Sequence, residues 1–310
     1  MKRTSEAVKT ARSIIPSWAA DALFQPPLRA AVKSGSRGLN SCAKHLTGER
    51  RRTHDQSLWL VRYVILGMFA GIAVNGAPIQ FQSSERQEAL VELYTSEGCS
   101  SCPPAESWLS RLKEKPGLWS DFVPVAFHVD YWNHLGWPDK WSSKQYADRQ
   151  RDYAAVWGSE NIYTPEFVLN GREWHNWFEL NGAPGLSGTK AGLLKVTSED
   201  THHWQVRFNP AVAGASGYEV NAALLGSGLD SDVNAGENAG RHLRHDFVVL
   251  KFIHQPLSPG NDGLQGVFTL DASQKTPEDS QALAVWVTRS GSLTPVQAVG
   301  GWLAKSDNMK

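Results

Sequence analysis

The sequence has few cysteines, three in 310 residues, and two of them stand close together. Cys99 and Cys102 form a Cys-x-x-Cys motif, whereas Cys42 lies alone nearer the N-terminus. So few cysteines exclude a small scaffold that is held together by several disulfides. No second Cys-x-x-Cys motif and no His-x-x-x-His pair follows, so the usual spacings of a tetrahedral zinc site are missing as well.

An excess of charge of one sign is also missing, because 31 Lys and Arg balance 31 Asp and Glu. The balance hides an asymmetry: residues 1–56 hold 11 basic and 4 acidic residues, whereas residues 57–310 hold 20 and 27. An acidic body without a basic stripe argues against nucleic acid as a partner.

The chain has no hydrophobic run as long as the roughly 20 residues that a membrane-spanning helix needs. The apolar segment 64–74 is shorter, follows basic residues and is followed by the small residues Gly76 and Ala77. This order is typical of an export signal, which we assign to residues 57–77. An uncleaved membrane anchor, or a buried helix, is the alternative.

Residues 1–56 precede that segment and show no sustained apolar periodicity, which predicts a disordered extension. Because an export signal normally begins a chain, we hypothesise that the translation start is misassigned and lies near Leu58 or Val61. Cys42 would then be lost, and the exported body would keep one pair of thiols in an oxidising compartment. The expected location is periplasmic or secreted, or the inner membrane if segment 57–77 stays attached.

Residues 86–181 alternate between strand and helix patterns. Buried strands are predicted at 89–95, 122–129 and 166–171, and helices with one apolar face at 103–112 and 142–157. Strand, helix, strand, helix and strand within about 80 residues predict an α/β sheet with parallel pairings.

The pattern changes after residue 181. Residues 182–189 have the composition of a linker. Residues 190–303 contain short runs in which apolar and polar residues alternate, as around Trp204, Val206 and Phe208. Short strands separated by loops rich in Gly and Asn predict a mostly antiparallel, sandwich-like all-β domain.

The Cys-x-x-Cys motif lies between the first predicted strand and the first predicted helix. A thiol at the start of a helix faces unpaired N–H groups and the positive end of the helix dipole, which stabilise the thiolate. Cys99 is therefore the candidate nucleophile and Cys102 its resolving partner. Thr164-Pro165 directly precedes a predicted strand, where thioredoxin-fold proteins place a cis-proline against the motif. We predict that Pro165 belongs to the catalytic set and that Thr164 presents its peptide groups to a substrate.

Six segments carry a wider resemblance: Val91–Ala105, Phe127–Trp137, Arg149-Gln150, Tyr163–Pro165, Gly236–Arg241 and His245-Asp246. Together they closely resemble the DUF1223 family, which contains bacterial exported proteins with a thioredoxin-like domain and no established activity. The resemblance covers roughly residues 86–303. It implies an α/β thioredoxin-like domain at 86–181, followed by the β-rich domain at 190–303, and implies the chemistry only by analogy.

Polar and aromatic residues follow the second predicted strand. His128 and Asp130 are two residues apart and are expected on one side near the end of that strand, where ligands bind in an open α/β sheet. We predict that they and Trp132 bind substrate or assist proton transfer; hydrogen bonding to the following loop is the alternative. The tryptophan-rich loop 131–141 is either a small core or a lip for a bound peptide.

Other candidates receive structural interpretations. Glu92 lies one residue out of step with the buried acid of ordinary thioredoxins, so a solvated or paired carboxylate is favoured over a proton shuttle. Glu97 would raise the pKa of Cys99 if it lay close. Residues 236–241 lack the lysine of a phosphate-binding loop, and we expect this glycine-rich segment to pack over the motif. The later histidines fit no metal-ligand spacing and are expected at the surface or in hydrogen bonds: His202, His203, His242, His245 and His254.

The sequence favours a cell-envelope thiol–disulfide oxidoreductase that uses the Cys-Ser-Ser-Cys pair and needs no cofactor. Its partner would be a protein or small-molecule thiol or disulfide. The alternative is a non-catalytic binding protein in which Cys99 and Cys102 form a structural disulfide. A third hypothesis places Cu(I) between the two thiolates, with His128 as a further ligand.

Overall fold

The computed structural model describes residues 78–179, 182–212, 217–272 and 280–303. The predicted extension, the predicted export signal and Cys42 lie outside these ranges and stay predictions. No helix within them is long and apolar enough to cross a membrane.

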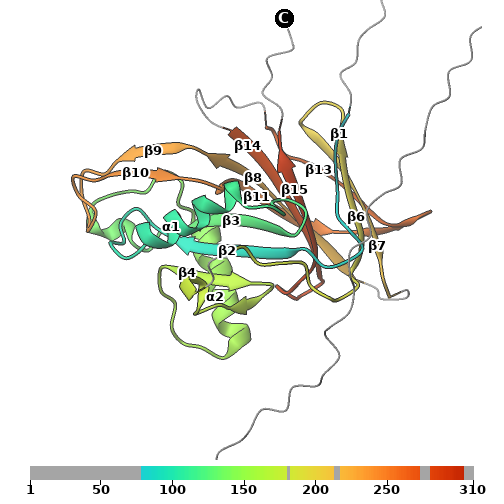
Figure 1. Cartoon of the computed structure of the whole chain (residues 1–310), viewed down its shortest axis with the longest axis horizontal. Coiled ribbons are helices and arrows are strands. Elements are labelled where there is room, and N and C mark those ends of the chain that lie inside the picture. Colours follow the sequence, from blue (N-terminus) through green and yellow to red (C-terminus); the bar gives the residue numbers. More distant parts are fainter. Residues whose placement is uncertain (1–77, 180–181, 213–216, 273–279, 304–310) are drawn as a thin grey trace, which may run out of the picture. The chain divides into compact units, whose positions relative to one another are not determined.

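The described chain is mostly β-structure, with two α-helices among many strands (Figure 1). Eight strands form the larger sheet, in the order β15-β14-β8-β11-β3-β2-β4-β5. Their bounds are Ala89–Thr95 for β2, Phe122–His128 for β3, Glu166–Leu169 for β4, Arg172–Glu173 for β5, Tyr218–Ser227 for β8, Val248–Pro256 for β11, Ser280–Arg289 for β14 and Pro295–Trp302 for β15.

The second sheet has five strands in the order β1-β6-β7-β13-β12, and all of its pairings are antiparallel. The bounds are Ile79–Gln82 for β1, Gly192–Ser198 for β6, His203–Pro210 for β7, Ser258–Gly260 for β12 and Gly263–Thr269 for β13. The alternation predicted around Trp204 is confirmed, because every second residue of β7 is buried. These side chains share one apolar cluster with Val220 and Val285 of the larger sheet.

The first region forms elements close to those predicted. β2 and β3 are apolar runs buried along their whole length, and they pair in parallel, whereas β2 and β4 are antiparallel. Helix α1 (Pro103–Ser110) begins with prolines, whose missing N–H is harmless in a first turn, and continues as the 3₁₀ turn η1 (Arg111–Glu114). Helix α2 (Lys144–Trp157) starts at a Ser143 cap and ends at Gly158 in the left-handed conformation. Two further 3₁₀ turns are η2 (Asn133–Leu135) and η3 (Trp177–Glu179).

The expected fold class, an α/β thioredoxin-like domain followed by a mostly antiparallel all-β domain, is wrong. β11 of the second region pairs in parallel with β3 of the first, at Val248 and Ala126, and the N–H of Ala126 donates to the carbonyl of Phe247 at 2.8 Å. One eight-stranded sheet therefore contains strands of both regions, and the described chain is mostly β. The sequence pattern of a strand predicts that the strand is buried but not which strand it pairs with. We therefore expected strands to pair only within their own region.

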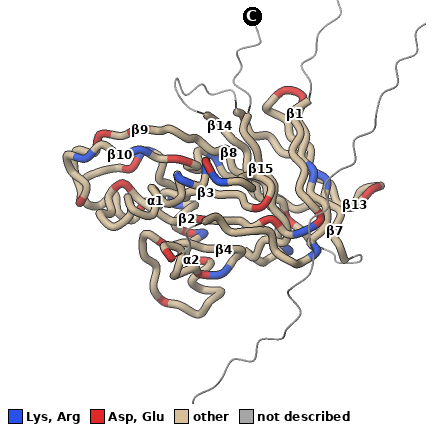
Figure 2. Tube along the Cα trace, in the orientation of Figure 1, with Lys and Arg blue, Asp and Glu red and all other residues tan. Residues whose placement is uncertain are grey.

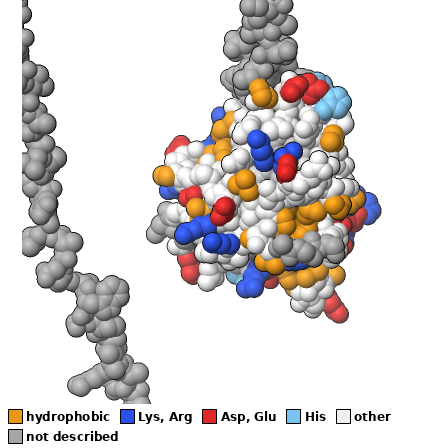
Figure 3. Space-filling model, turned by 90° about the vertical axis from the view of Figure 1, so that its right-hand side faces the viewer, with side chains coloured by type: hydrophobic (Ala, Val, Ile, Leu, Met, Phe, Trp, Pro, Cys, Tyr) orange, Lys and Arg blue, Asp and Glu red, His pale blue; other side chains and the backbone are white. Residues whose placement is uncertain are grey.

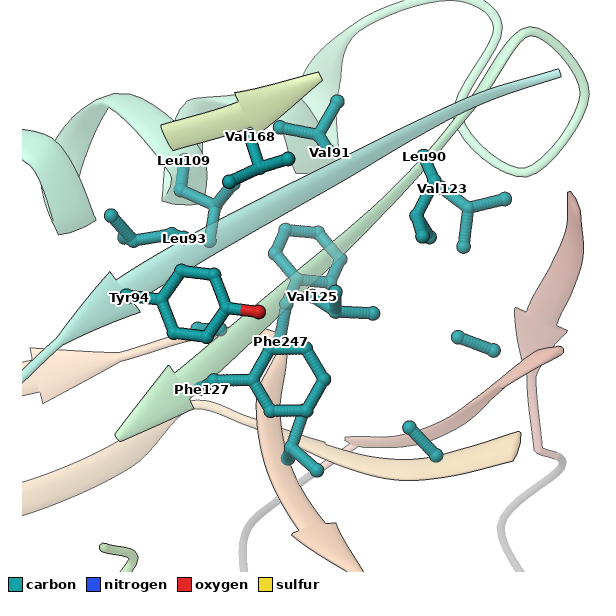
Figure 4. Packing of buried hydrophobic residues seen from close by; sticks show 14 of the residues in the cluster. Leu90, Val91, Leu93, Tyr94, Leu109, Val123, Val125, Phe127, Val168 and Phe247 are labelled. Carbon is teal, nitrogen blue, oxygen red and sulfur yellow. The ribbon is translucent and has the colours of Figure 1, made fainter. Parts of the chain in front are cut away.

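Apolar packing around β2 and β3 joins the two regions. Figure 4 shows part of this buried cluster, with Phe247 of the second region among side chains of β2 and β3. Tyr94 and Phe127 stack in it, with their ring centroids 5.5 Å apart. Burying one such side chain stabilises a fold by about 1.5–3 kcal/mol, so the cluster is a large part of what holds the sheet together.

A buried ion pair lies in the same core. Arg149 Nε donates to Glu92 Oε2 at 2.9 Å, and the Tyr153 hydroxyl donates to Glu92 Oε1 at 2.6 Å. The guanidinium also lies over the rings of Phe252 and Trp286, 5.5 and 5.4 Å from their centroids. The favoured interpretation of Glu92 as a paired carboxylate is confirmed.

A hairpin brings the second region to the Cys-x-x-Cys motif. β9 (Leu229–Asp232) and β10 (His242–His245) pair antiparallel, and β10 lies beside α1 (Figure 1). The loop between the two strands contains the glycine-rich segment, in which Gly236 and Gly240 adopt positive φ angles of 77° and 80°. Glycine adopts this conformation without steric cost, so the loop can fold back over the motif.

Charged residues of both signs are interspersed along the trace in Figure 2. The face in Figure 3 likewise mixes basic, acidic and hydrophobic side chains. Neither view of the described residues shows a continuous basic stripe. The absence of nucleic acid among the partners stays a prediction.

Candidate active site around the Cys-x-x-Cys motif

A tight turn between β2 and α1 positions both thiols. The N–H of Cys99 donates to the carbonyl of Ser96, and the N–H of Cys102 donates to the carbonyl of Cys99, each at 3.2 Å. Cys102 directly precedes the first residue of α1. Both thiols are free and buried. The predicted location of the motif between a strand and a helix is therefore confirmed.

The Cys99 sulfur has two polar neighbours. Its Sγ lies 3.2 Å from the Ser101 hydroxyl, which can donate to a thiolate, and 3.6 Å from the carbonyl oxygen of Thr164, which accepts from the protonated thiol. A hydrogen bond with Cys102 has the largest effect and, together with Ser101, lowers the pKa of the Cys99 thiol to about 6, although burial opposes this. Cys99 is therefore mostly ionised at neutral pH.

The Cys102 thiol, in contrast, favours the protonated form. Burial raises its pKa well above the usual value, and the negative charges of Cys99 and Glu106 add to the shift. A hydrogen bond with Thr95 offsets part of it. At neutral pH the pair consists of one thiolate and one protonated thiol.

The Thr164-Pro165 peptide bond is cis and lies against the motif, which confirms that prediction. The Thr164 carbonyl oxygen also lies 3.4 Å from the Ser101 hydroxyl. On the other side, the indole Nε1 of Trp132 donates to Thr164 Oγ1 at 2.8 Å. The structure thus places Cys102 and Thr164 against Cys99, and Pro165 and Trp132 are the neighbours of Thr164.

Residues 236–241, which we call the strap, cover the motif. Glu237 Oε2 accepts hydrogen bonds from the N–H of Ser100 at 2.9 Å and from its hydroxyl at 2.7 Å. Asn238 Nδ2 donates to the carbonyls of Glu97 and Cys99 at 2.8 and 2.9 Å. The predicted packing of this segment over the motif is confirmed, and Cys99 beneath it is only 1% exposed.

A buried His–carboxylate cluster lies behind the motif. His128 Nδ1 lies 2.7 Å from Asp139 Oδ2. His245 Nδ1 lies 2.7 Å from Glu106 Oε2, and its Nε2 lies 3.2 Å from Glu97 Oε1. The two imidazole centroids are 5.2 Å apart. All five side chains are buried, so their charges interact with little screening by water.

The electrostatics of this cluster favour ionised groups. Burial opposes ionisation of the two acids. The charge of His245 nevertheless holds the pKa of Glu106 below its usual value, and the charge of His128 holds the pKa of Asp139 below its usual value. Burial likewise opposes protonation of His245, yet the Glu106 carboxylate raises the pKa of His245 to about 10. The cluster therefore holds buried carboxylates together with an imidazolium.

Two predicted residues form no hydrogen bond with either thiol within the described ranges. His128 is fully buried and faces Asp139 and His245. For the Asp130 carboxylate we find no hydrogen bond or ion pair within the described ranges; its carbonyl accepts from the N–H of Asn133 at 3.0 Å. β3 ends at His128, so strand alternation no longer relates the two side chains.

Sequence reasoning missed Glu106, Asp139 and His245. Spacing assigned His245 to the surface or to hydrogen bonds, but it is 1% exposed and lies between two acids. Glu106 follows Cys102 by four residues, on the face of α1 that turns to the core, and an acid at such a position was a usable signal. Asp139 lies in an irregular loop, where no periodicity could identify it.

The fold and site define a mostly β protein with a strap-covered dithiol. The chain belongs to the family described as "Protein of unknown function (DUF1223)", whose model matches residues 90–288, so the predicted resemblance is confirmed. No curated protein matches the sequence.

Two solved structures are similar to this chain. The crystal structure of protein AGR_C_4864 from Agrobacterium tumefaciens is 25% identical, with a TM-score of 0.47, and the match covers 73% of this chain and 98% of that one. HBP35 of Porphyromonas gingivalis is 13% identical, with a TM-score of 0.48, and the match covers 71% of this chain and 76% of that one.

Proposed function

We propose that the protein is a thiol–disulfide oxidoreductase of the cell envelope, in which Cys99 and Cys102 alternate between dithiol and disulfide. The observation that carries the proposal is the placement of two free thiols in the tight turn before α1, where the Cys99 sulfur lies 3.2 Å from the Ser101 hydroxyl. The pKa of Cys99 is lowered to about 6, whereas that of Cys102 is raised. A thiolate next to a protonated partner is the form in which a dithiol starts disulfide exchange.

The reaction needs only the two thiols and a substrate disulfide. The Cys99 thiolate attacks one substrate sulfur, forms a mixed disulfide and expels the other substrate sulfur as a thiolate. Cys102 then attacks the Cys99 sulfur, closes the Cys99–Cys102 disulfide and releases the remaining substrate sulfur, which leaves with the Cys102 proton. The substrate gains two electrons and the pair loses two.

Groups around Cys99 support a role for the neighbouring backbone in substrate binding. The Thr164 carbonyl lies 3.6 Å from Cys99 Sγ and accepts a hydrogen bond from Ser101, so it faces the reacting sulfur. Trp132 fixes the Thr164 side chain through its indole N–H. A substrate chain that approaches Cys99 would meet this carbonyl and the edge of Trp132.

We infer the substrate class from the access of a substrate to Cys99 and from the expected location of the protein. Cys99 is 1% exposed beneath the strap, which supports a small disulfide, or an extended chain that binds after the strap opens. The pattern of residues 57–77 supports a location in the cell envelope, periplasmic, secreted or anchored in the inner membrane.

The same burial favours a second candidate, a non-catalytic binding protein. A Cys99–Cys102 disulfide covered by the strap would be shielded from exchange, and its role would be structural. A disulfide that closes so short a loop stabilises the chain little, which is why we rank this candidate second.

The reduction potential of the pair separates the two candidates. We expect the full chain, equilibrated in glutathione buffers, to be half-oxidised between about −120 and −270 mV, as exchange proteins are. In chains that also carry Cys42→Ser, Cys102→Ser should trap a mixed disulfide with glutathione at Cys99, and the matched Cys99→Ser variant should trap none. A potential below about −300 mV together with no trapped adduct would establish the structural role.

A further inference from the structure

The cluster behind the dithiol has the composition of a metal site. Glu106 from α1, His128 from β3 and His245 from β10 each offer one ligand atom, and these atoms all lie within 4.8 Å of one another. We propose that these three side chains bind one borderline divalent cation, of which Zn²⁺ is the representative. Three separate elements supply the ligands, so no spacing in the sequence could predict the site.

His128 is held in the way that ligating histidines are held. Its Nδ1 lies 2.7 Å from Asp139 Oδ2, which fixes the ring and leaves Nε2 as the remaining nitrogen. Nε2 is fully buried and has no hydrogen-bond partner among the described residues. A carboxylate behind the ring is the usual support of a zinc-binding histidine. A bound cation would also remove the penalty of a buried, unpaired nitrogen.

The ring nitrogens of His245 lie close to two acids, but their N–H bonds do not point at the acid oxygens. Its Nδ1 is 2.7 Å from Glu106 Oε2 and its Nε2 is 3.2 Å from Glu97 Oε1. Within the described part of the chain, however, neither nitrogen makes a hydrogen bond of acceptable geometry. A hydrogen-bonded imidazolium directs its N–H bonds at the acceptor oxygens. Nitrogen and oxygen atoms that are close but not aligned are instead suited to share a cation.

The charge of the cluster also requires compensation. Glu97, Glu106 and Asp139 are three buried carboxylates, and they face two imidazoles. In the described ranges no Lys or Arg forms an ion pair with any of the three. With the imidazoles neutral, as metal ligands must be, the three carboxylates would bury three negative charges, which is costly. A divalent cation would offset two of them.

The ligand set selects the class of cation. Two imidazole nitrogens and one carboxylate oxygen suit Zn²⁺ and its neighbours, whereas Ca²⁺ and Mg²⁺ prefer oxygen ligands alone. Cu(I) prefers thiolates. Thr95 separates the cluster from the dithiol, since its side chain hydrogen-bonds to both Glu106 and Cys102. The proposed site therefore excludes the two cysteines and does not depend on the proposed function.

Metal binding to the full chain tests the proposal. After treatment with a chelator and addition of Zn²⁺, elemental analysis should find one tightly held zinc per chain. The Cys99→Ser/Cys102→Ser double variant should hold the same zinc, whereas Glu106→Gln and His245→Asn should lose it. Asp139→Asn, which removes only the support of His128, should weaken binding by about 10–100-fold. His203→Asn, at an exposed histidine, is the matched control.

Co²⁺ substitution keeps the test decisive if a ligand variant does not fold. Co²⁺ in the wild-type chain should give ligand-field bands in the visible spectrum and no thiolate charge-transfer band, and the double cysteine variant should give the same spectrum. Retention of no metal by the wild-type chain would overturn the proposal. A thiolate charge-transfer band, or loss of metal in the double cysteine variant, would assign the metal to the dithiol and overturn it as well.

Discussion

Glu237 accepts two hydrogen bonds from Ser100, one from its backbone N–H at 2.9 Å and one from its hydroxyl at 2.7 Å. The contact fixes the strap to the residue that directly follows Cys99. Ser100 keeps the pKa of the Glu237 carboxyl below its usual value, so the contact is charge-assisted at neutral pH. Access to Cys99 therefore depends on a residue that lies far away in the sequence.

Replacing Glu237 should change thiol reactivity more than stability. We expect Glu237→Gln to loosen the strap and to speed the reaction of Cys99 with iodoacetamide by about fivefold. The melting temperature should stay within about 4 °C of the wild type, because an exposed contact adds little stability. Glu160→Gln, also exposed, is the control, and an unchanged alkylation rate in Glu237→Gln would refute the role of the strap.

Asn238 should matter for stability as well as for access. Its side chain donates to two carbonyls in the motif turn and is fully buried. Asn238→Ala leaves both carbonyls without this donor, and we expect a loss of about 1–3 kcal/mol in the free energy of unfolding. Urea unfolding measures this loss. Asn234→Ala, at an exposed site in the same loop, should change stability far less, and equal effects of the two variants would contradict the account.

The ion pair between Arg149 and Glu92 should show strong coupling. Arg149→Met leaves the Glu92 carboxylate buried and unpaired, and we expect a loss of about 3–5 kcal/mol. The double variant Glu92→Leu/Arg149→Met should lose less than the single one, because both charges are then gone. Arg151→Met, on the exposed face of the same helix, is the control. Additive effects in denaturant unfolding would show that the pair is not coupled.

Glu88 should make stability depend on pH. Burial raises its pKa from 4.5 to about 8, so between these values the native state keeps a proton that the unfolded state has released. Native stability should therefore fall as the pH rises from about 4.5 to 8, by at most about 1.4 kcal/mol per pH unit. Glu88→Gln removes this part of the fall, whereas the exposed Glu85→Gln should not. Parallel pH dependences for Glu88→Gln and the wild type, in urea unfolding, would disprove the assignment.

Local patterns predicted the elements of the first region well. The apolar run of β2, the prolines that open α1 and the Ser143 start of α2 are signals that neighbouring residues carry on their own. The cis bond at Thr164-Pro165 and the approach of the strap to the motif also came from sequence. The fold class and the buried His–carboxylate cluster could not be predicted in this way, because they depend on contacts between distant segments.

The pairing of β3 with β11 decided the fold class, and no pattern in either strand encodes it. The same holds for the cluster of Glu106, His128 and His245, whose members come from three elements. Asp130 was chosen by strand alternation, which stops where β3 ends at His128. Sequence reasoning thus identified the dithiol and His128, but not the role of His245 or the acids that the fold places beside them.

The central claim, that Cys99 is a thiolate beside a protonated Cys102, is tested most directly by titrating the ultraviolet absorbance of the thiolate in the reduced full chain. This measurement needs no reagent to reach the buried sulfur. With Cys42 replaced by Ser, so that only the two motif thiols titrate, we predict a step of one thiolate with its midpoint near pH 6, absent from Cys99→Ser and followed by no second step below pH 9. A first step only above pH 8, or a step near pH 6 that persists in Cys99→Ser, would contradict the account.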